Sequence, residues 1–519
     1  MKWIYVALTF LTFSVELKAQ QPDAVLQQKL RGKTKVSEIY EEAEKHLVAE
    51  TERLRTVDPG KAKTAERQRK KWARWNAYWE PRQNPDGTPA NVQKRYATAT
   101  NSASFSQRTL QADPSSGQWT LVGPGNTDDG SVGRVSRIAF HPTSASTIYI
   151  GTPNAGIWRT TNTGISWQAL SSYAPTLGVS GIVVSHANAN TIYALTGDGD
   201  SFYGGDLFGT DGGFQQEYGY TERSIGVLRS NDGGTSWYRT GAFGTLTDDD
   251  VYFGYRLVQH PTNAQMLMAA TSHGIYRTLD GGNSWIRCPL NGVASNSRVI
   301  FDIEFMPGNP NIVYASSTGS GFFRSTDAGL TFQLVTGSDL SLLTGASRME
   351  LAVSPANPQV VYIFAGPGRL ENDNNSNDTF LGMFRSTDGG QTFTRRANSP
   401  DLLGFDGFCC TFEHQSRYDM ALALKPTNSN VVITGGLVMW KSTDGGVTYN
   451  EETDYFPDLN NSDYIHPDIH DIAYSPHNAN LLYAATDGGI WVSNDDAYSW
   501  ASLNNGLSIT QFYKMEAVN

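Results

Sequence analysis

Histidine and aspartate alternate near the end of the sequence, in residues 464–471. In an extended chain His466, Asp468 and His470 would lie on one face, because successive side chains of a strand point to opposite sides. Two imidazoles and one carboxylate form a ligand set that suits zinc or another transition metal. The same side chains could instead hydrogen-bond and order the backbone. The pattern therefore indicates either a metal site or a polar cluster.

A column of charged residues recurs at one position of a repeated strand pattern. Counted from the proline, or its equivalent, that ends each first strand, the fifth residue back is usually charged and the fourth is apolar. The charged members are Arg137, Arg256, Asp302, Glu350 and Asp471. If the first strands line a central channel, these side chains would face it. Such a ring could bind a ligand, or its opposite charges could pair with one another.

Two long insertions add carboxylates and aromatic rings. The first, rich in glycine, contains Asp198, Asp200 and Asp206, and the second places acids among asparagines in residues 371–378. Pairs of carboxyl groups cleave glycosides, and calcium prefers carboxylate oxygens as ligands. Residues 373–377 begin like a calcium-binding loop, but the glycine at its sixth position and the acid at its twelfth are missing. Both insertions could also be solvated surface loops. We take Asp198, Asp200 and Asp206 as candidate ligand-binding residues.

The elements that would position these residues are built around a turn that occurs seven times. Each copy has Ser or Thr, then Asp or Asn two residues later, and ends with Ser or Thr and an aromatic residue. The copies are residues 160–167, 230–237, 278–285, 325–332, 386–393, 442–449 and 493–500. The carboxylate can accept backbone N–H groups of such a turn, and glycine tolerates its positive φ. Ala497 replaces a glycine in the last copy, so we expect that turn to be the most irregular.

Short strand patterns surround each turn. Two precede it, as in residues 136–140 and 147–151 of the first repeat, a third leads into the turn, and a fourth follows it. The turns start roughly 47 to 70 residues apart, a spacing that fits one four-stranded propeller blade per repeat. We predict an all-β fold with a seven-bladed β-propeller, or a larger one if the chain continues, and a small N-terminal helical segment.

The turn sequence S-T-D-G-G-x-T-F/W resembles the Asp-box, or BNR repeat. Its place between third and fourth strands is similar to propellers of the sortilin (VPS10) type and of family 74 xyloglucanases. Residues 119–124, 133–135 and 151–159 also resemble large secreted bacterial proteins of that group. The resemblance extends over about residues 118–519. It implies a propeller scaffold, with either ligand binding or glycoside hydrolysis as the function.

The resemblance to family 74 can be checked at its catalytic aspartate, which in those enzymes follows the second strand of the first blade within T-D-x-G-G. This chain has Thr152, Pro153 and Asn154 there, so the carboxylate is missing. A similar pattern, with Asp487, occurs in the seventh repeat. A glycoside hydrolase therefore remains the alternative function, and no catalytic residue is assigned.

The chain before the repeats has three predicted parts. Residues 1–19 combine a basic start, an apolar run and a small final residue, as a secretory signal peptide does. Residues 20–80 show helical spacing, with Trp72, Trp75 and Trp79 on one face. These rings could bind a partner or polymer, or dock the helix on the propeller. Residues 81–117 resemble an irregular linker, and residues 118–519 are assigned to the propeller, with an incomplete last repeat.

The composition limits the classes of partner. A net charge of −11 and a pI near 5.3 argue against nucleic acid as the main partner. No stretch after the signal-like segment is long and apolar enough for a membrane span. Three cysteines do not form a disulfide framework for a chain of this size. The adjacent Cys409 and Cys410 could form a strained disulfide or remain thiols.

These observations predict a secreted or cell-surface binding protein whose loop face recognises an extracellular protein or a polysaccharide. A glycoside hydrolase that resembles xyloglucanases is the alternative function. Zinc and calcium are the candidate cofactors, with His466, Asp468 and His470 as the candidate metal ligands. Because the repeats are a scaffold, we expect the function to lie in the channel and the loops rather than in the turns themselves.

Overall fold

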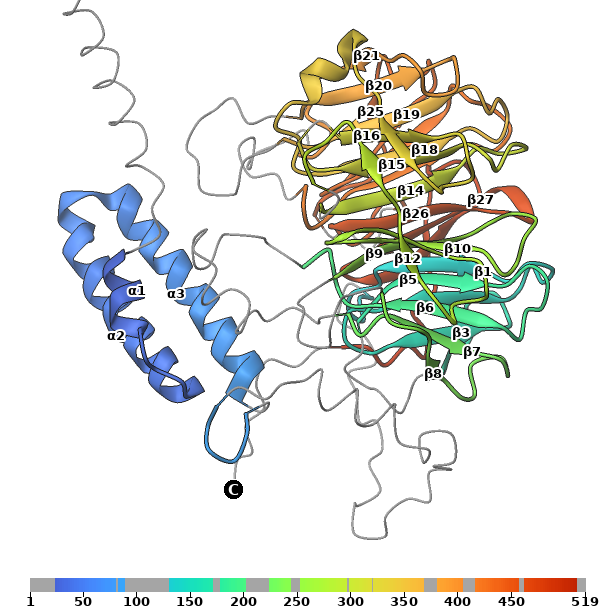
Figure 1. Cartoon of the computed structure of the whole chain (residues 1–519). Helices are drawn as coiled ribbons and strands as arrows, with labels where there is room; N and C mark the ends of the chain where they lie inside the picture. The colour runs from blue at the N-terminus through green and yellow to red at the C-terminus, as the bar shows by residue number, and fades with distance from the viewer. Residues whose placement is uncertain are drawn as a thin grey trace, which may run out of the picture. The chain divides into compact units, whose positions relative to one another are not determined.

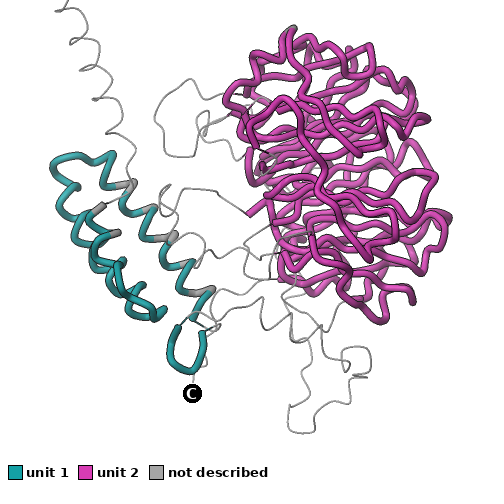
Figure 2. The backbone as a smooth tube through the Cα atoms, viewed as in Figure 1, with its two compact units in different colours: residues 1–92, 203–220, 512–519 teal, residues 93–202, 221–511 magenta. Residues whose placement is uncertain are grey.

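The structure is a computed structural model that describes residues 24–80, 83–88, 130–170, 178–201, 224–243, 253–295, 298–319, 321–367, 380–404, 416–456 and 462–510. The chain forms two compact units, which we describe separately (Figure 2). The described part of the first unit is mainly helical and lies before residue 89. The described part of the second unit begins at residue 130 and is built of strands.

The described part of the helical unit contains three helices: α1 (Ala24–Leu30), α2 (Val36–Val57) and α3 (Pro59–Trp79). Asp58 separates α2 from α3 and caps α3, because its Oδ1 accepts the Lys61 N–H at 3.1 Å. Pro59 is the first residue of α3, where proline is tolerated because a backbone N–H at this position would have no acceptor within the helix.

The three tryptophans of α3 are buried within the helical unit. Trp72 and Trp75 contact each other edge to face, with ring centroids 5.3 Å apart, and Trp79 joins the same cluster. The other members of this cluster are apolar residues of α1 and α2. The interpretation of these rings as an exposed surface for a partner or polymer is therefore wrong, because they form the apolar core of the helical unit itself. Docking of the helix on the propeller stays a prediction.

The described strands of the second unit form seven sheets, six with four strands and one with five (Figure 1). The first sheet contains β1 (Arg137–Phe140), β2 (Ile148–Gly151), β3 (Ile157–Thr160) and β4 (Gln168–Ala169). The second contains β5 (Val179–Val184), β6 (Ile192–Thr196), β7 (Val227–Ser230) and β8 (Tyr238–Arg239). The third contains β9 (Gly254–Gln259), β10 (Leu267–Thr271), β11 (Gly274–Thr278) and β12 (Ile286–Arg287).

The fourth sheet contains β14 (Ile300–Phe305), β15 (Val313–Ser317), β16 (Gly321–Ser325) and β17 (Phe332–Leu334), with β13 (Leu290–Asn291) parallel to β17. A 3₁₀ helix, η3 (Ser338–Leu343), leads to the fifth sheet, which contains β18 (Met349–Val353), β19 (Val361–Ala365), β20 (Gly382–Ser386) and β21 (Thr394–Ala397). The sixth contains β22 (Ala421–Leu424), β23 (Val432–Gly435), β24 (Met439–Ser442) and β25 (Asn450–Glu451). The seventh contains β26 (Ile469–Ser475), β27 (Asn478–Thr486), β28 (Gly489–Ser493) and β29 (Ala501–Ser502).

The sheets are arranged as a closed ring. The first strands of neighbouring sheets contact one another in the order β1, β5, β9, β14, β18, β22 and β26, and β26 contacts β1. The first strand of each sheet is therefore innermost. This arrangement confirms the predicted seven-bladed β-propeller, in a mostly β chain with a small N-terminal helical segment.

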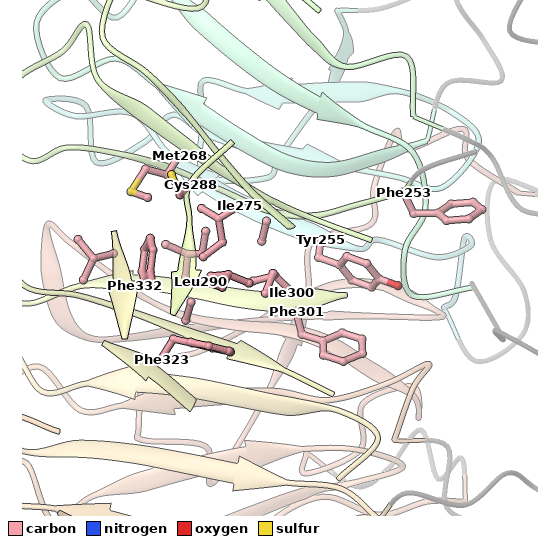
Figure 3. Packing of buried hydrophobic residues seen from close by; sticks show 14 of the residues in the cluster. Phe253, Tyr255, Met268, Ile275, Cys288, Leu290, Ile300, Phe301, Phe323 and Phe332 are labelled. Atoms are coloured by element: carbon pink, nitrogen blue, oxygen red, sulfur yellow. The ribbon is translucent and has the colours of Figure 1, made fainter. Parts of the chain in front are cut away.

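Apolar side chains fill the space between neighbouring blades. Figure 3 shows one such cluster, to which Tyr255, Met268 and Ile275 contribute from the third sheet and Ile300 and Phe323 from the fourth. The second strands β10, β15 and β19 are buried along their whole length, because neighbouring sheets cover both of their faces. This packing holds each innermost strand in place at the channel.

Each of the seven repeated turns lies between the third and fourth strands of a sheet. In the fifth sheet the Ser386 hydroxyl accepts the Gly390 N–H at 2.9 Å and donates to Asp388 Oδ1 at 2.7 Å. Asp388 also accepts the N–H and the hydroxyl of Thr392 at 3.0 and 2.6 Å. The carboxylate therefore accepts the polar hydrogens of its own turn, which is a structural role.

The last turn keeps these bonds although alanine replaces glycine. The Ala497 N–H donates to the Ser493 hydroxyl at 2.9 Å, and Ser499 donates to Asp495 through its N–H and its hydroxyl. Ala497 adopts a φ of 76°, in the left-handed region that favours glycine. The expected irregularity of this turn is therefore absent from its hydrogen bonds, and the substitution is accommodated by backbone strain.

Several sequence predictions fall outside the described residues. They are the signal peptide of residues 1–19, most of the linker at 81–117, the acids of residues 371–378, the pair Cys409 and Cys410, and the tail of residues 511–519. Within the described ranges, no helix combines the length and the apolar character that a membrane crossing requires.

Candidate functional site

Ionisable side chains gather at one end of the ring, where the first strands begin and the second strands end. Antiparallel pairing brings these positions together, as Arg137 opposite Gly151 and Ile469 opposite Thr486 illustrate. We call this end of the channel the mouth. Its ionisable side chains are Arg134, Arg137, Asp198, Asp200, Arg348, Tyr418, Asp419, Asp468, His470 and Asp487.

Asp200 lies at the centre of this group and is only 2% exposed. Its Oδ1 is 3.1 Å from Arg348 Nη1, and its Oδ2 is 3.1 Å from Arg137 Nη1 and 3.4 Å from His470 Nδ1. Burial raises the pKa of Asp200, but the two guanidinium charges and His470 outweigh burial and hold that pKa well below its ordinary value. Asp200 is therefore an ionised carboxylate with three cationic or polar partners.

Arg137 connects Asp200 to the backbone of several blades. Its Nε donates to Ser180 O at 2.9 Å, its Nη2 to Tyr255 O at 3.1 Å and its Nη1 to His470 O at 3.1 Å. These carbonyls belong to β5, β9 and β26, the innermost strands of three other sheets. Since a buried guanidinium needs acceptors for its five N–H groups, these contacts give Arg137 a structural role.

Asp487 is a second carboxylate of the mouth, and 26% of its side chain is exposed. The Tyr418 hydroxyl donates to its two oxygens at 2.8 and 2.9 Å, and His470 Nε2 donates to Oδ1 at 2.9 Å. Burial raises the pKa of Asp487, yet His470 and the Arg134 charge lower it overall. Asp487 is therefore ionised at neutral pH, fixed in orientation and partly accessible.

A short turn between β27 and β28 positions Asp487. The Gly488 N–H donates to the Thr486 hydroxyl at 3.1 Å, and the Asp487 N–H donates to Asp468 O at 3.1 Å. A side chain at position 488 would collide with His466, so the turn requires glycine there. The Thr-Asp-Gly-Gly sequence is thus the local reason why a carboxylate stands at the mouth in this blade.

Arg134 and Asp198 form a further buried pair. Arg134 Nη2 contacts Asp198 Oδ1, and its Nη1 donates to the Ser201 hydroxyl at 2.7 Å. The guanidinium lies over the Tyr418 ring, 5.0 Å from its centroid, and that ring meets His470 edge to face at 4.7 Å. The Arg134 charge is thereby neutralised within the protein, and Tyr418 is held between Arg134 and His470.

The first insertion therefore begins as part of the mouth. Asp198 and Asp200 are buried and ion-paired, so the interpretation of this insertion as a solvated loop is wrong for these two residues. The reason is that both follow β6 directly, where the second strand ends beside the innermost strands. Asp206, the third candidate of the insertion, lies outside the described residues.

A separate set of charges lies further along the innermost strands. Arg256 is 3.0 Å from Glu304, 3.3 Å from Asp302 and 3.7 Å from Asp471. Asp302 and Asp471 each also accept a backbone N–H from the first strand of the next sheet, at 2.9 Å. Because Arg256 and Asp471 belong to sheets that are not neighbours, their contact shows that these side chains point into the channel.

Glu350 belongs to the same channel and accepts the Arg348 Nε at 2.8 Å. Burial raises the pKa of Glu350 to about 7, although the Arg348 charge opposes this shift. The predicted column of Arg137, Arg256, Asp302, Glu350 and Asp471 thus contains charges of opposite sign that pair within the protein. Ligand binding by this column stays a prediction.

The predicted metal ligands do not gather at one point. His470 contacts Asp200 and Asp487, and His466 Nδ1 is 3.0 Å from Pro467 O. Asp468 has a φ of 62°, which interrupts the extended chain on which the predicted alternation depends. Among the described residues, no group of three or more His, Cys, Asp or Glu side chains is placed to hold a metal ion. The predicted set of His466, Asp468 and His470 is therefore not formed.

Two important residues of the mouth escape the sequence analysis although a signal for them exists. Arg348 and Asp419 each lie two residues before a position of the aligned column, Glu350 and Ala421, and just ahead of β18 and β22. Extending the column by one alternation would have included both. Arg134 and Tyr418 do not occupy a repeated position of the aligned strands. Their roles depend on which loops meet at the mouth, which the sequence pattern does not show. Asp487 stands out in the sequence only because residues 486–489 are similar to the T-D-x-G-G pattern of family 74.

Comparisons with known proteins were made for the whole chain. No protein-family model matches it, and no curated protein matches it in sequence. Among solved structures, an ancestral GH74 enzyme matches with a TM-score of 0.50 and 18% identity, over 74% of this chain and 48% of that chain. The GH74 enzyme of Niastella koreensis gives 0.49 and 20%, over 72% and 55%. YCF48 from Cyanidioschyzon merolae gives 0.43 and 13%, over 70% and 95%.

These similarities concern the fold. At 18% identity, the match to the ancestral GH74 enzyme supports the propeller fold and carries no information about ligands or catalysis. The chain spans about half the length of the GH74 structures that it matches. The function therefore has to be argued from the residues of the mouth.

Proposed function

We propose that the protein is a propeller binding module whose ligand contacts the mouth of the channel at Asp487. The observation that carries this proposal is the state of the Asp487 carboxylate, which is partly exposed and held by both Tyr418 and His470. Partial exposure admits a ligand, and a fixed orientation reduces the ordering cost of binding. Convergent polar groups at a channel mouth are typical of binding sites.

The arginines of the mouth differ from Asp487, because they are buried and paired within the protein. Arg134, Arg137 and Arg348 each pair with a buried acid of the same protein. Their charges therefore stabilise the ring and are satisfied without a ligand. Asp487 differs because part of its side chain reaches solvent while its partners keep it ionised.

We further propose that the ligand is an extracellular protein or a polysaccharide and that the protein is secreted or displayed at the cell surface. The signal-like pattern of residues 1–19 supports this location, together with the resemblance of the repeated turns to the Asp-boxes of sortilin-type propellers. The turns satisfy their own hydrogen bonds, which fits the scaffold role that Asp-boxes would have. The proposal does not require a metal ion.

The test uses a glycan array and a peptide array probed with the full-length chain. We expect a ligand that wild type retains and Asp487→Asn loses, because asparagine keeps the shape and removes the charge. Glu50→Gln is the control, since it removes one carboxylate from α2, where Glu50 pairs with Arg53. Equal retention of every ligand by wild type and Asp487→Asn would overturn the assignment of the site.

A glycoside hydrolase is the second candidate function, because the pKa values of two carboxyl groups of the mouth are shifted in opposite directions. Burial raises the pKa of Asp419 well above its ordinary value, and the charges of Asp468 and Asp487 add to this shift. The pKa of Asp487 is lowered. One protonated and one ionised carboxyl group are what glycoside cleavage uses, as acid and as base or nucleophile.

Release of reducing ends from soluble β-glucans distinguishes the two functions. A hydrolase of the mouth should lose activity by about 10²-fold or more in either Asp419→Asn or Asp487→Asn, because each variant removes a proton donor or acceptor. A binding module should release no reducing ends. Release that both variants leave unchanged would reject the mouth as a catalytic site.

A further inference from the structure

Three aspartates from two neighbouring blades meet at the mouth. Asp419 precedes β22, Asp468 precedes β26 and Asp487 follows β27, while β22 and β26 contact each other. The Asp487 N–H donates to Asp468 O at 3.1 Å, and Tyr418, the residue before Asp419, donates to the Asp487 carboxylate. These contacts tie the three aspartates to one small region of the mouth.

Asp419 carries an oxygen that the described protein leaves unsatisfied. Asp419 is only 1% exposed, and its Oδ2 has no hydrogen-bond partner among the described residues. A buried acceptor without a partner is unfavourable, and a donor supplied by a ligand would satisfy it. This oxygen is an observation independent of the acidic character of the cluster.

The electrostatic environment of Asp419 favours a positive group. Burial raises the pKa of Asp419, and Asp468 and Asp487 raise it further by more than the Arg348 charge lowers it. The two neighbouring acids therefore outweigh the Arg348 charge at Asp419. The arginines of the mouth are oriented by other acids, namely Asp198, Asp200 and Glu350.

The absence of a metal-binding arrangement among the described acids favours an organic cation over a metal ion. A metal ion needs ligand atoms within about 2.0–2.6 Å of one point. No group of three His, Cys, Asp or Glu side chains in the described ranges meets that need. An ammonium group accepts wider spacing, because each of its three N–H groups spans about 2.7–2.9 Å to an acceptor.

We infer that the mouth binds the ammonium group of a lysine side chain of a partner protein at Asp419, Asp468 and Asp487. This inference rests on the proposed binding function and names the chemical group that the ligand presents. One N–H would bind Asp419 Oδ2, and the others would bind the carboxylates nearer to solvent. A lysine suits this site better than an amino sugar, because a narrow aliphatic stem needs less space than a sugar ring beside a carboxyl group that is only 1% exposed.

The experiment is a calorimetric titration of the full-length chain with a five-residue peptide that has blocked ends and one central lysine. The matched probe carries acetyl-lysine, which removes the positive charge. We expect saturable binding of the lysine peptide alone, with an affinity that falls as NaCl is raised, because salt screens charge attraction. Asp487→Asn and Asp468→Asn should each weaken binding about tenfold, whereas Glu50→Gln should not change it.

The melting temperature of each variant shows whether the titrated protein is folded. Two aspartate variants are used so that the test still works if one of them fails to fold. Equal affinity for the lysine and acetyl-lysine peptides, or unchanged affinity in both aspartate variants, would overturn the ammonium site. A second arm uses a chitosan hexamer and its fully N-acetylated counterpart. Binding of the chitosan hexamer alone would overturn the protein partner and assign the ammonium group to an amino sugar.

The failure of this inference can be distinguished from failure of the proposed function. An array ligand that Asp487→Asn loses, with no binding of either ammonium probe, would support the binding function and reject the ammonium group. Absence of any array ligand and of any probe binding would reject both. The two experiments therefore test separately whether the site exists and which chemical group it binds.

Discussion

His470 is the residue whose protonation the structure constrains most directly. Its buried ring has one acid at each nitrogen, Asp200 at 3.4 Å and Asp487 at 2.9 Å. A neutral imidazole has one N–H and can donate to one acid, whereas the imidazolium donates to both. Burial and the Arg134 charge lower the pKa of His470, but the two nearby acids outweigh them and raise it above its ordinary value.

We expect the contribution of His470 to the free energy of unfolding to fall as the pH rises above about 6.5. The folded pKa lies above the unfolded one, so the stabilisation is complete below the unfolded pKa and is lost as the pH rises through the folded pKa. Urea unfolding of wild type and His470→Gln at pH 5.5 and 8.5 measures this. The difference between the two proteins should be larger at pH 5.5.

His141 provides the matched control for this prediction. Burial lowers the pKa of His141, and the charges of His477 and Arg159 lower it further. Its contribution should therefore change in the opposite direction and decrease as the pH falls. If the effect of His470→Gln is the same at both pH values, or follows the trend of His141→Gln, the assignment of a charged His470 is wrong.

At the scale of a single element, the repeated turns show how much a second carboxylate oxygen contributes. In the first repeat Asn162 occupies the acidic position, and its Oδ1 accepts the Ser166 N–H at 3.0 Å and the Thr160 hydroxyl at 2.9 Å. An aspartate makes these bonds with one oxygen and uses the other for a hydroxyl, as Asp388 does with Thr392. The amide side chain therefore reproduces part of the network.

Asp388→Ala should lower the free energy of unfolding by roughly 1–3 kcal/mol, because the Ser386 hydroxyl and the Thr392 N–H lose their acceptor. Asp388→Asn should cost less, since the first repeat works with asparagine. Urea unfolding measures both values. Equal costs for the two variants would contradict the hydrogen-bond account, and a loss of ligand binding without a loss of stability would contradict the scaffold role.

The helical unit is the second element with a direct test. Trp75 is 1% exposed and packs with Trp72 against α1 and α2. Trp75→Ala should therefore destabilise the helices by about 3–5 kcal/mol, the usual cost of emptying a large buried site. Helix content followed by circular dichroism should be lost at a lower temperature, while the β transition should not move.

Arg69→Ala is the control for Trp75, because Arg69 makes a surface ion pair with Glu44, at 2.6 Å. Such pairs contribute little, so Arg69→Ala should leave the helical transition nearly unchanged. A lowered melting temperature of the strands in Trp75→Ala, with no change in the helices, would instead indicate docking on the propeller. That result would support the docking alternative drawn from the sequence.

At the scale of the whole molecule, the ring is closed by residues that precede β1. The N–H groups of Val132 and Val135 donate to Gly488 O and Thr486 O at 3.0 Å each. The buried Asn504 links the same segments, because its Nδ2 donates to Gly130 O and Gly488 O at 3.0 Å each. The first and seventh blades are therefore joined by backbone contacts as well as by packing.

Asn504→Ala should lower the free energy of unfolding by roughly 1–3 kcal/mol, because the Ile490 N–H and the Gly130 carbonyl lose this partner and the Gly488 carbonyl loses one of its two donors. Thermal unfolding of the full-length chain measures the loss. The neighbouring Asn505→Ala is the control, since Asn505 is exposed and its replacement should change stability by no more than about 0.5 kcal/mol. Similar effects of the two substitutions would argue against closure through Asn504.

Most of the blade plan follows from sequence alone, because it depends on local chemistry. Strand alternation, the Ser/Thr and Asp spacing of the turns and the glycines after them act within a few residues. The same alternation explains why a column of charges, including Arg256 and Asp302, lies on the innermost strands. The glycine at position 488 and the carboxylate before it are also visible as a local pattern.

The pairing of the charges was decided by the tertiary structure, because closing the ring brings distant segments together. Arg137 reaches Asp200, and Arg256 reaches Asp471, only once the blades are placed around one channel. The left-handed backbone of Asp468 likewise depends on its contacts, since its N–H donates to Leu437 O. The metal prediction failed for this reason: alternation holds within a strand, and the segment before β26 is not one.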